Sequence, residues 1–197
     1  MLKRTVIGLF AVTAALVGGV VVPSAFADNG GGAEGRAKAA AVTITYDDSQ
    51  APEYVDAITQ AIQIWNDSVN NVEITHVAEG QQAEVSFESF DGWPQAELGP
   101  IMPGGHGTVW YGKEAVDQGY DLIRIAAHEF GHSLGLPDVK PGPCESLMSG
   151  STGGVDCKNA TPNAEEIAQV EENYANGGAA AKRQQHAEPV VIGWLDE

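Results

Sequence analysis

Apolar and polar residues alternate with a period of two in three stretches of the chain, and this period predicts β-strands. The stretches are residues 42–46, 72–77 and 84–90, which are rich in β-branched and aromatic side chains. Residues 109–111 predict a further short strand. Between the last two, residues 91–107 are punctuated by glycine and proline, so they predict a surface loop and a candidate rim for a cleft.

Apolar residues at steps of three and four, the spacing of one helix face, predict three helices. The first opens at Pro52, because proline is favoured in the first turn of a helix. The second is capped by Asp121 and runs through Gly135, and the last begins at Pro162. Each apolar stripe is predicted to face the core, and the stripes comprise Val55, Ile58, Ile62 and Trp65, then Ile123, Ala127, Phe130 and Leu134, then Ile167, Val170 and Tyr174.

The two ends of the chain differ in composition from its middle, which predicts four segments. Residues 1–27 combine a basic start, an apolar run and a small-residue cleavage pattern, so we expect a secretory signal peptide, with a membrane anchor as the alternative. Residues 28–41 are rich in glycine and alanine, which is typical of a pro-segment or flexible leader. Residues 42–177 can form one domain around a single core. For residues 178–197, the tail, a disordered extension is the default, and docking on the domain or on a partner is the lesser alternative.

The charge and the cysteines narrow the class of protein. The formal net charge is -17, and so acidic a surface repels nucleic acid and anionic lipid, which excludes both as expected partners. Cys144 and Cys157 suit the oxidising compartment of a secreted protein, and we expect one disulfide between them. A zinc-binding role for the cysteines is the competing interpretation, but two thiolates alone do not complete a structural zinc site.

The stretch that begins at His128 carries the pattern His-Glu-x-x-His. Residues four apart share a helix face at about 6 Å along the axis, so His128 and His132 can bind one metal ion with Glu129 beside it. Catalytic zinc usually takes three protein ligands and keeps one position open. Gly135 can end the helix with a positive φ, after which the chain turns back and Asp138 is the first side chain that can supply the third ligand. The alternative, a chance pattern in an ordinary helix, leaves the offsets of Gly135 and Asp138 unexplained.

With these motifs the chain resembles the snapalysins, small secreted neutral zinc metalloproteases of streptomycetes within the metzincin clan. The resemblance implies an α+β fold with a metzincin-like single domain, in which a twisted mixed sheet and helices form a zinc cleft between an upper and a small lower subdomain. It spans about residues 42–177 and is carried by His-Glu-x-x-His-x-x-Gly-x-x-Asp and by residues 142–144, 147–150, 157, 162–164 and 175–177.

The resemblance also implies roles for residues outside the zinc motif. Met148 is expected to pack beneath the ligands as a soft apolar floor that binds no metal. A calcium ion is implied near Asp121, although Ile123 stands where a threonine is usual. Lys140 stands where the family usually has a tyrosine, so it either supplies a positive charge to the reacting oxyanion or leaves a weaker site. The strand at residues 109–111 is expected at the sheet edge, where an extended substrate can pair with it, with ordinary packing of its aromatic side chains as the alternative.

Together, these features predict a secreted, extracellular zinc endopeptidase that acts on polypeptides. His128, His132 and Asp138 hold one Zn²⁺, and Glu129 activates the water at the zinc and passes its proton to the leaving amine. The resemblance implies a preference for an aromatic residue just after the scissile bond. We expect a monomer that does not associate with membranes after signal cleavage. The alternative is a catalytically weak or inactive secreted zinc-binding interaction module, which fits Lys140 and the tail, but metal binding alone does not require Glu129.

Overall fold

The computed structural model describes residues 40–178 and 190–194. The predicted signal peptide at residues 1–27 lies outside the described residues, as do almost all of the predicted leader and most of the tail. Within the described ranges, no helix is long and apolar enough to cross a membrane.

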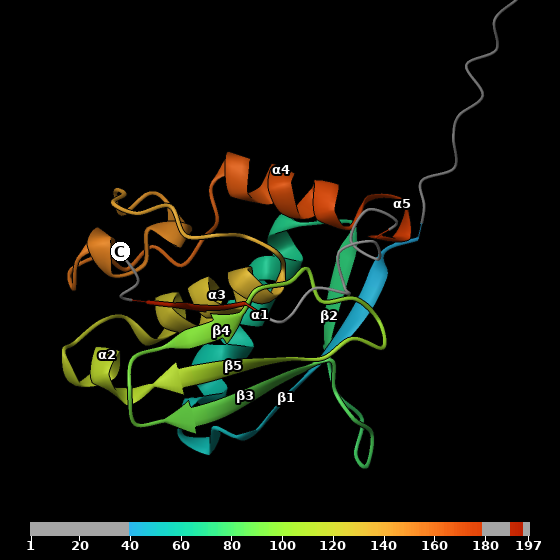
Figure 1. Cartoon of the computed structure of the whole chain (residues 1–197), viewed down its shortest axis with the longest axis horizontal. Helices are drawn as coiled ribbons and strands as arrows, with labels where there is room; N and C mark the ends of the chain where they lie inside the picture. The colour runs from blue at the N-terminus through green and yellow to red at the C-terminus, as the bar shows by residue number, and fades with distance from the viewer. Residues whose placement is uncertain (1–39, 179–189, 195–197) are drawn as a thin grey trace, which may run out of the picture. The chain divides into compact units, whose positions relative to one another are not determined.

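The described residues contain a six-stranded sheet with the strand order β2-β1-β3-β5-β4-β6 (Figure 1). β1, β2, β3 and β5 run parallel to one another, whereas β4 is antiparallel to β5 and β6 is antiparallel to β4. The prediction of a mixed sheet is therefore confirmed. The strands are β1 Val42–Gln50, β2 Val72–His76, β3 Val85–Phe90, β4 Gln95–Glu97, β5 Gly107–Gly112 and β6 Val191–Gly193.

Two predictions about the part of the sheet beyond β3 are wrong. Residues 91–107, predicted as a loop, contain β4, in which the fully buried Ala96 lies opposite Val109 of β5. β5 therefore lies between β3 and β4 and is not the edge strand. A strand of three residues is too short to show a period of two, and the surrounding glycines and prolines conceal it.

The tail also departs from the default prediction of a disordered extension. Its described part, residues 190–194, forms β6 and ends in Trp194, whose side chain is fully buried. Docking on the domain, the lesser alternative, describes this segment. Burial of an indole removes a large apolar area from water, which offsets the entropy lost when a short strand becomes ordered.

Two helices form the layer behind the sheet (Figure 1). The 3-10 turn Pro52–Tyr54 leads into α1, Val55–Ser68, and α3 spans Leu122–Ser133. Trp65 of α1 is fully buried and donates its indole N–H to the carbonyl oxygen of Ala127 at 2.9 Å, which joins the two helices. Phe130 of α3 stacks on Phe87 of β3 with ring centroids 5.8 Å apart. The predicted stripes of these two helices are therefore largely confirmed as core: Ile58, Ile62 and Trp65 of α1 are buried, as are Ala127, Phe130 and Leu134 at α3. The prediction is wrong for Val55, which is 37% exposed at the start of α1.

The segment after α3 lies above this helix in Figure 1, on the side away from β3 and β5. The disulfide between Cys144 and Cys157 is present, as predicted, and encloses the stretch that holds Met148. Asn163 caps α4 through a capping box, so this helix begins after Pro162 as expected. The remaining helical elements are α2 Lys113–Asp117, the 3-10 element η2 Leu147–Gly153, α4 Ala164–Asn173 and α5 Ala175–Gly178.

Candidate metal centre and active site

Helix α3 presents the two imidazoles of the His-Glu-x-x-His pattern side by side. Asp121 caps the helix, because its Oδ1 accepts the N–H of Arg124 at 3.0 Å. His128 and His132 are fully buried, and their Nε2 atoms are 3.2 Å apart. The predicted juxtaposition of these two side chains on one helix face is therefore present.

Hydrogen bonds on the far side of each ring decide which nitrogen faces the centre. His128 Nδ1 lies 3.0 Å from the carbonyl oxygen of Leu147, and His132 Nδ1 lies 2.7 Å from that of Leu136. A carbonyl oxygen can only accept, so each Nδ1 carries the proton and donates it. Each Nε2 then carries a lone pair, and the two lone pairs face each other across 3.2 Å.

A bend after α3 brings in the third candidate ligand. Gly135 adopts a φ of +91°, which is cheap only for glycine, and its N–H donates to the carbonyl oxygen of His132 at 2.8 Å. The chain then returns past Pro137, and Asp138 Oδ1 lies 3.3 Å from His128 Nε2 and 3.7 Å from His132 Nε2. The sequence prediction placed Asp138 here through the same bend.

The three facing atoms fit a tetrahedral zinc ion. Asp138 Oδ1 is buried and has no hydrogen-bond partner among the described residues. A tetrahedral zinc with bonds of about 2.0–2.1 Å separates its ligand atoms by about 3.3 Å, and the observed separations of these atoms are 3.2, 3.3 and 3.7 Å. Two lone pairs and a carboxylate oxygen repel one another at such distances, so a cation between them accounts for the arrangement.

The protonation states also suit a metal. Burial, reinforced by the neighbouring His128, lowers the pKa of His132 to about 3. Burial works to raise the pKa of Asp138, but its polar neighbours, with the Lys140 ammonium group among them, hold the pKa below its usual range. At neutral pH both groups are therefore in the deprotonated form that metal binding requires.

Glu129 lies beside this group of atoms. Its side chain is fully buried, and Oε1 is 3.9 Å from His128 Nε2. One ring nitrogen each of His128 and His132 and one carboxylate oxygen of Glu129 all lie within 4.8 Å of one another. The carboxylate is therefore close enough to exchange a proton with a water held at the centre.

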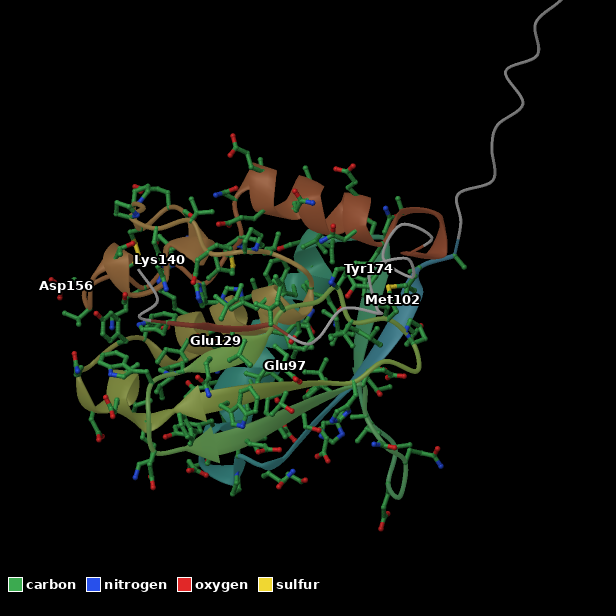
Figure 2. All side chains as sticks on the ribbon, in the orientation of Figure 1. Glu97, Met102, Glu129, Lys140, Asp156 and Tyr174 are labelled. Carbon is green, nitrogen blue, oxygen red and sulfur yellow. A yellow bond between two sulfur atoms is a disulfide. The ribbon has the colours of Figure 1, made fainter. Side chains whose placement is uncertain are left out.

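Lys140, the departure from the family pattern, contacts the third candidate ligand. Its Nζ donates to Asp138 Oδ2 at 3.0 Å and to the carbonyl oxygen of Gly193 at 2.8 Å, and its side chain is only 7% exposed. Figure 2 labels Lys140 and Glu129, which lie near the ribbon of β6 in this view. In this arrangement the lysine charge is directed at the aspartate and at the tail.

Met148 packs against α3, the helix that carries His128 and His132. The side chain is fully buried, and a Cβ added at Gly131 would meet its sulfur at 2.8 Å, so the glycine in the His-Glu-x-x-His pattern leaves room for the methionine. The same stretch of chain supplies the Leu147 carbonyl oxygen that accepts from His128.

Sequence reasoning missed the carboxylate that holds this stretch. Glu166 is 5% exposed and accepts the Ser146 hydroxyl at 2.7 Å, the Met148 N–H at 2.9 Å and the Leu147 N–H at 3.3 Å. It also accepts the N–H of Asn163 at 2.7 Å. The capping-box pattern Asn-x-x-Glu was visible in the sequence, but it indicates only a helix start.

A buried cation approaches the same stretch from α3. The Arg124 side chain is fully buried and donates to the Ser146 carbonyl oxygen at 3.0 Å and to Ser149 Oγ at 2.9 Å. Arg124 and Glu166 therefore fix the loop that anchors His128.

Asp121, the candidate calcium ligand, has other partners. One of its oxygens caps α3, and the other lies 3.9 Å from the Lys158 ammonium group. A cation already beside the carboxylate disfavours a second one, so this arrangement gives calcium no support.

Residues 41–177 match the sequence pattern described as the Streptomyces extracellular neutral proteinase (M7) family. The extracellular small neutral protease of Streptomyces caespitosus is 40% identical over 143 residues, which cover 69% of this chain and 99% of that protein. The protein of the same name from Streptomyces coelicolor is 40% identical over 143 residues, which cover 73% of this chain and 64% of that protein.

Among solved structures, high choriolytic enzyme 1, a hatching enzyme zinc-protease from the medaka fish Oryzias latipes, matches with a TM-score of 0.37 and 24% identity. This match covers 51% of the present chain and 48% of that structure. The matched part of the chain spans less than two thirds of the length of the S. coelicolor relative. On the match over residues 41–177, the chain belongs to the Streptomyces extracellular neutral proteinase (M7) family.

Proposed function

We propose that the protein is a secreted zinc-dependent endopeptidase that hydrolyses extracellular polypeptides. The carrying observation is the convergence of His128 Nε2, His132 Nε2 and Asp138 Oδ1, with separations of 3.2, 3.3 and 3.7 Å and Glu129 beside them. Export agrees with the relatives, which are named extracellular proteases. The signal peptide at residues 1–27, the monomeric state and the lack of membrane association stay predictions.

In this proposal the three ligand side chains are His128, His132 and Asp138. Bound zinc would supply a Lewis acid that polarises the scissile carbonyl group and makes water more acidic. Glu129 takes a proton from the attacking water and gives it to the leaving amine, so that one carboxylate acts first as base and then as acid. The carbonyl groups of Leu147 and Leu136 hold the two imidazoles in the tautomer that leaves Nε2 free for the metal.

We also infer a preference for an aromatic residue just after the scissile bond, as the family resemblance implies. An aromatic ring of the chain itself supports this inference. Trp194 lies edge-on to His128 with ring centroids 4.8 Å apart, so the space beside the candidate ligand accepts a large flat ring.

The test of the proposed function is the substitution Glu129→Gln. The amide cannot accept the proton of the attacking water, so hydrolysis of casein should fall by at least about 10²-fold, the usual contribution of a general base. Zinc content, measured by metal analysis after dialysis, should stay at one ion per chain. Glu73→Gln, an exposed carboxylate on β2, is the matched control and should keep full activity. A Glu129→Gln variant that digests casein as wild type does would refute this role.

The second candidate is a secreted zinc-binding module without catalysis. The contact of Lys140 with Asp138 favours it, because the ammonium group draws charge from a candidate ligand. The two candidates differ in one assay: a chelator-sensitive casein digest by wild type supports the endopeptidase, whereas one bound zinc with no digestion supports the module.

A further inference from the structure

The C-terminal strand β6 occupies the edge of the sheet that flanks the candidate metal centre. Gln95, Ala96 and Glu97 of β4 pair antiparallel with Gly193, Ile192 and Val191 of β6. At one end the Trp194 N–H donates to the Pro94 carbonyl oxygen at 2.8 Å, and at the other the Leu98 N–H donates to the Val190 carbonyl oxygen at 2.7 Å. Extended peptides add to exposed sheet edges through main-chain bonds of this kind.

Trp194, the residue directly after β6, reaches the candidate metal centre. The Trp194 ring lies 4.8 Å from the His128 ring and 5.5 Å from the Tyr120 ring, edge-on in both cases, and is fully buried. Its indole N–H has no hydrogen-bond partner among the described residues. The surroundings therefore accept the ring by shape and not by a matched polar contact, as expected of a pocket that receives aromatic side chains in general.

Lys140 links the strand to the centre. One ammonium group donates both to Asp138 Oδ2 and to the carbonyl oxygen of Gly193. The contact holds the tail against the very carboxylate that faces the imidazoles. A tyrosine at this position would carry no such charge.

With β6 in place the side chains at the candidate metal centre are out of reach of a substrate. Glu129, the proposed base, is fully buried, as are His128 and His132. A general base must contact both the attacking water and the scissile bond of a bound peptide. β6 and Trp194 must therefore move away before a substrate binds. The strand is held unevenly, because Val191 is 46% exposed whereas Trp194 is fully buried. One side chain therefore provides most of its apolar anchorage.

We propose that residues 190–194 are an intramolecular inhibitor that occupies the substrate-binding edge of β4 and fills the pocket beside His128 with Trp194. The inference rests on the proposed endopeptidase function. Substrate and tail compete for the same edge, so the full-length chain works only in the fraction of time for which β6 is displaced, and removal of the tail by another protease would make activation permanent.

The size of the effect follows from tethering. A segment that belongs to the same chain as its binding site is held there at an effective concentration of about 1 mM. If the same segment as a free peptide binds with a Kd of about 0.1 mM, the tethered segment occupies the edge in about ten molecules for each molecule in which the edge is open. This occupancy lowers kcat/KM about tenfold. Because the inhibition is competitive, the apparent KM changes and kcat stays the same.

Two substitutions in the full-length chain test the proposal. Trp194→Ala removes the anchor, and Ile192→Pro removes a backbone N–H from the middle of the strand without changing the anchor. Both should raise kcat/KM about tenfold on a fluorogenic peptide with an aromatic residue after the scissile bond, mainly through a lower KM. Val191→Ala, an exposed position on the same strand, is the matched control and should stay within twofold of wild type. Circular dichroism and intact mass establish that each variant is folded and ends at Glu197.

A second readout is independent of turnover. In a Glu129→Gln background, which prevents self-cleavage, hydrogen exchange should show a protected amide at Leu98, whose N–H donates to the Val190 carbonyl oxygen, and Trp194→Ala should abolish this protection. A synthetic peptide with the sequence of residues 190–197 should inhibit the Trp194→Ala variant with a Kd of about 0.1 mM, the value assumed above.

The outcomes separate this inference from the proposed function. Wild type that hydrolyses the peptide as fast as both variants, or a Leu98 amide that exchanges equally in the presence and absence of Trp194, would overturn the inhibitor and leave the endopeptidase intact. Failure of wild type and of all variants to hydrolyse any peptide with zinc bound would overturn the endopeptidase, and the inhibitor with it.

Discussion

Substitution of Glu166 tests whether the stretch Ser146–Met148, which packs against α3, holds His128 in place. The carboxylate is buried between α4 and the stretch Ser146–Met148. Oε1 accepts the Ser146 hydroxyl and the Met148 N–H, and Oε2 accepts the N–H groups of Leu147 and Asn163. Glu166→Gln keeps the size of the side chain but exchanges one of these accepting oxygens for a donor.

The magnitude follows from the bonds that are lost. Whichever way the amide is turned, its NH₂ group faces donors that it cannot satisfy, and a backbone donor left buried without an acceptor costs about 1–3 kcal/mol. If the NH₂ group replaces Oε2, the N–H groups of Leu147 and Asn163 lose their acceptor, and the longer of those bonds, at 3.3 Å, is the weaker. We therefore expect the free energy of unfolding to fall by about 2–4 kcal/mol. The Leu147 carbonyl that orients His128 becomes less fixed, so zinc affinity should fall about 10- to 100-fold.

The assay is urea unfolding of the metal-free chain, together with zinc titration against a chromophoric chelator. Glu165→Gln is the matched control, because this neighbouring glutamate is exposed on the same helix, and it should change stability by no more than about 0.5 kcal/mol. Equal unfolding free energies for Glu166→Gln and Glu165→Gln would refute the hydrogen-bond reasoning. A destabilised Glu166→Gln chain with wild-type zinc affinity would instead refute the link to His128.

Three further predictions follow. Gly135→Ala should destabilise the protein by more than Gly80→Ala. Both glycines have a positive φ, but of the two only Gly135 would place an added Cβ against backbone, at 2.9 Å from the nitrogen of Pro100. The difference between the two losses of unfolding free energy in urea therefore measures that contact, and equal losses would show that it is absent. Lys140→Tyr should raise kcat/KM, since the ammonium group no longer contacts a candidate ligand and the tail, and an unchanged or lower value would contradict this. The hydrogen bond to Asp48 raises the pKa of His76 above 6.5, so the stability lost in His76→Gln should be largest below pH 6.5 and should vanish as the pH rises through the raised pKa; a loss that grows with pH would have the wrong sign.

The chain departs from the family pattern at Lys140 and in its C-terminal tail, and the two departures are in contact. The family resemblance implies a tyrosine at the position of Lys140, and the described tail lies beyond the part of the chain that matches the family, residues 41–177. In the structure the lysine donates to the tail and to Asp138 at once. Two features that look independent in the sequence therefore meet in one contact.

The sequence by itself determined what depends on local spacing. The interval of four residues between His128 and His132 set both rings on one helix face, and the glycine three residues later turned the chain so that Asp138 met them. The period of two located β1, β2 and β3, the short run at residues 109–111 indicated β5, and the two cysteines formed the one disulfide expected of them. These features are recognisable because each is determined by residues within a few turns of one another.

Only the tertiary structure decided which distant groups complete the site. Gly193 lies 53 residues from Lys140, and Leu147 lies 19 residues from His128, so no local period links either pair. Glu166 is an ordinary helix-capping residue in the sequence, and its role beneath the metal centre follows from the position of α4. β4 is too short to show alternation and becomes a strand because β5 offers it unpaired backbone groups. The pairing of β6 with β4 and the contact of Trp194 with His128 arise in the same way, since only folding brings the edge of β4 and the His128 ring to this distant segment.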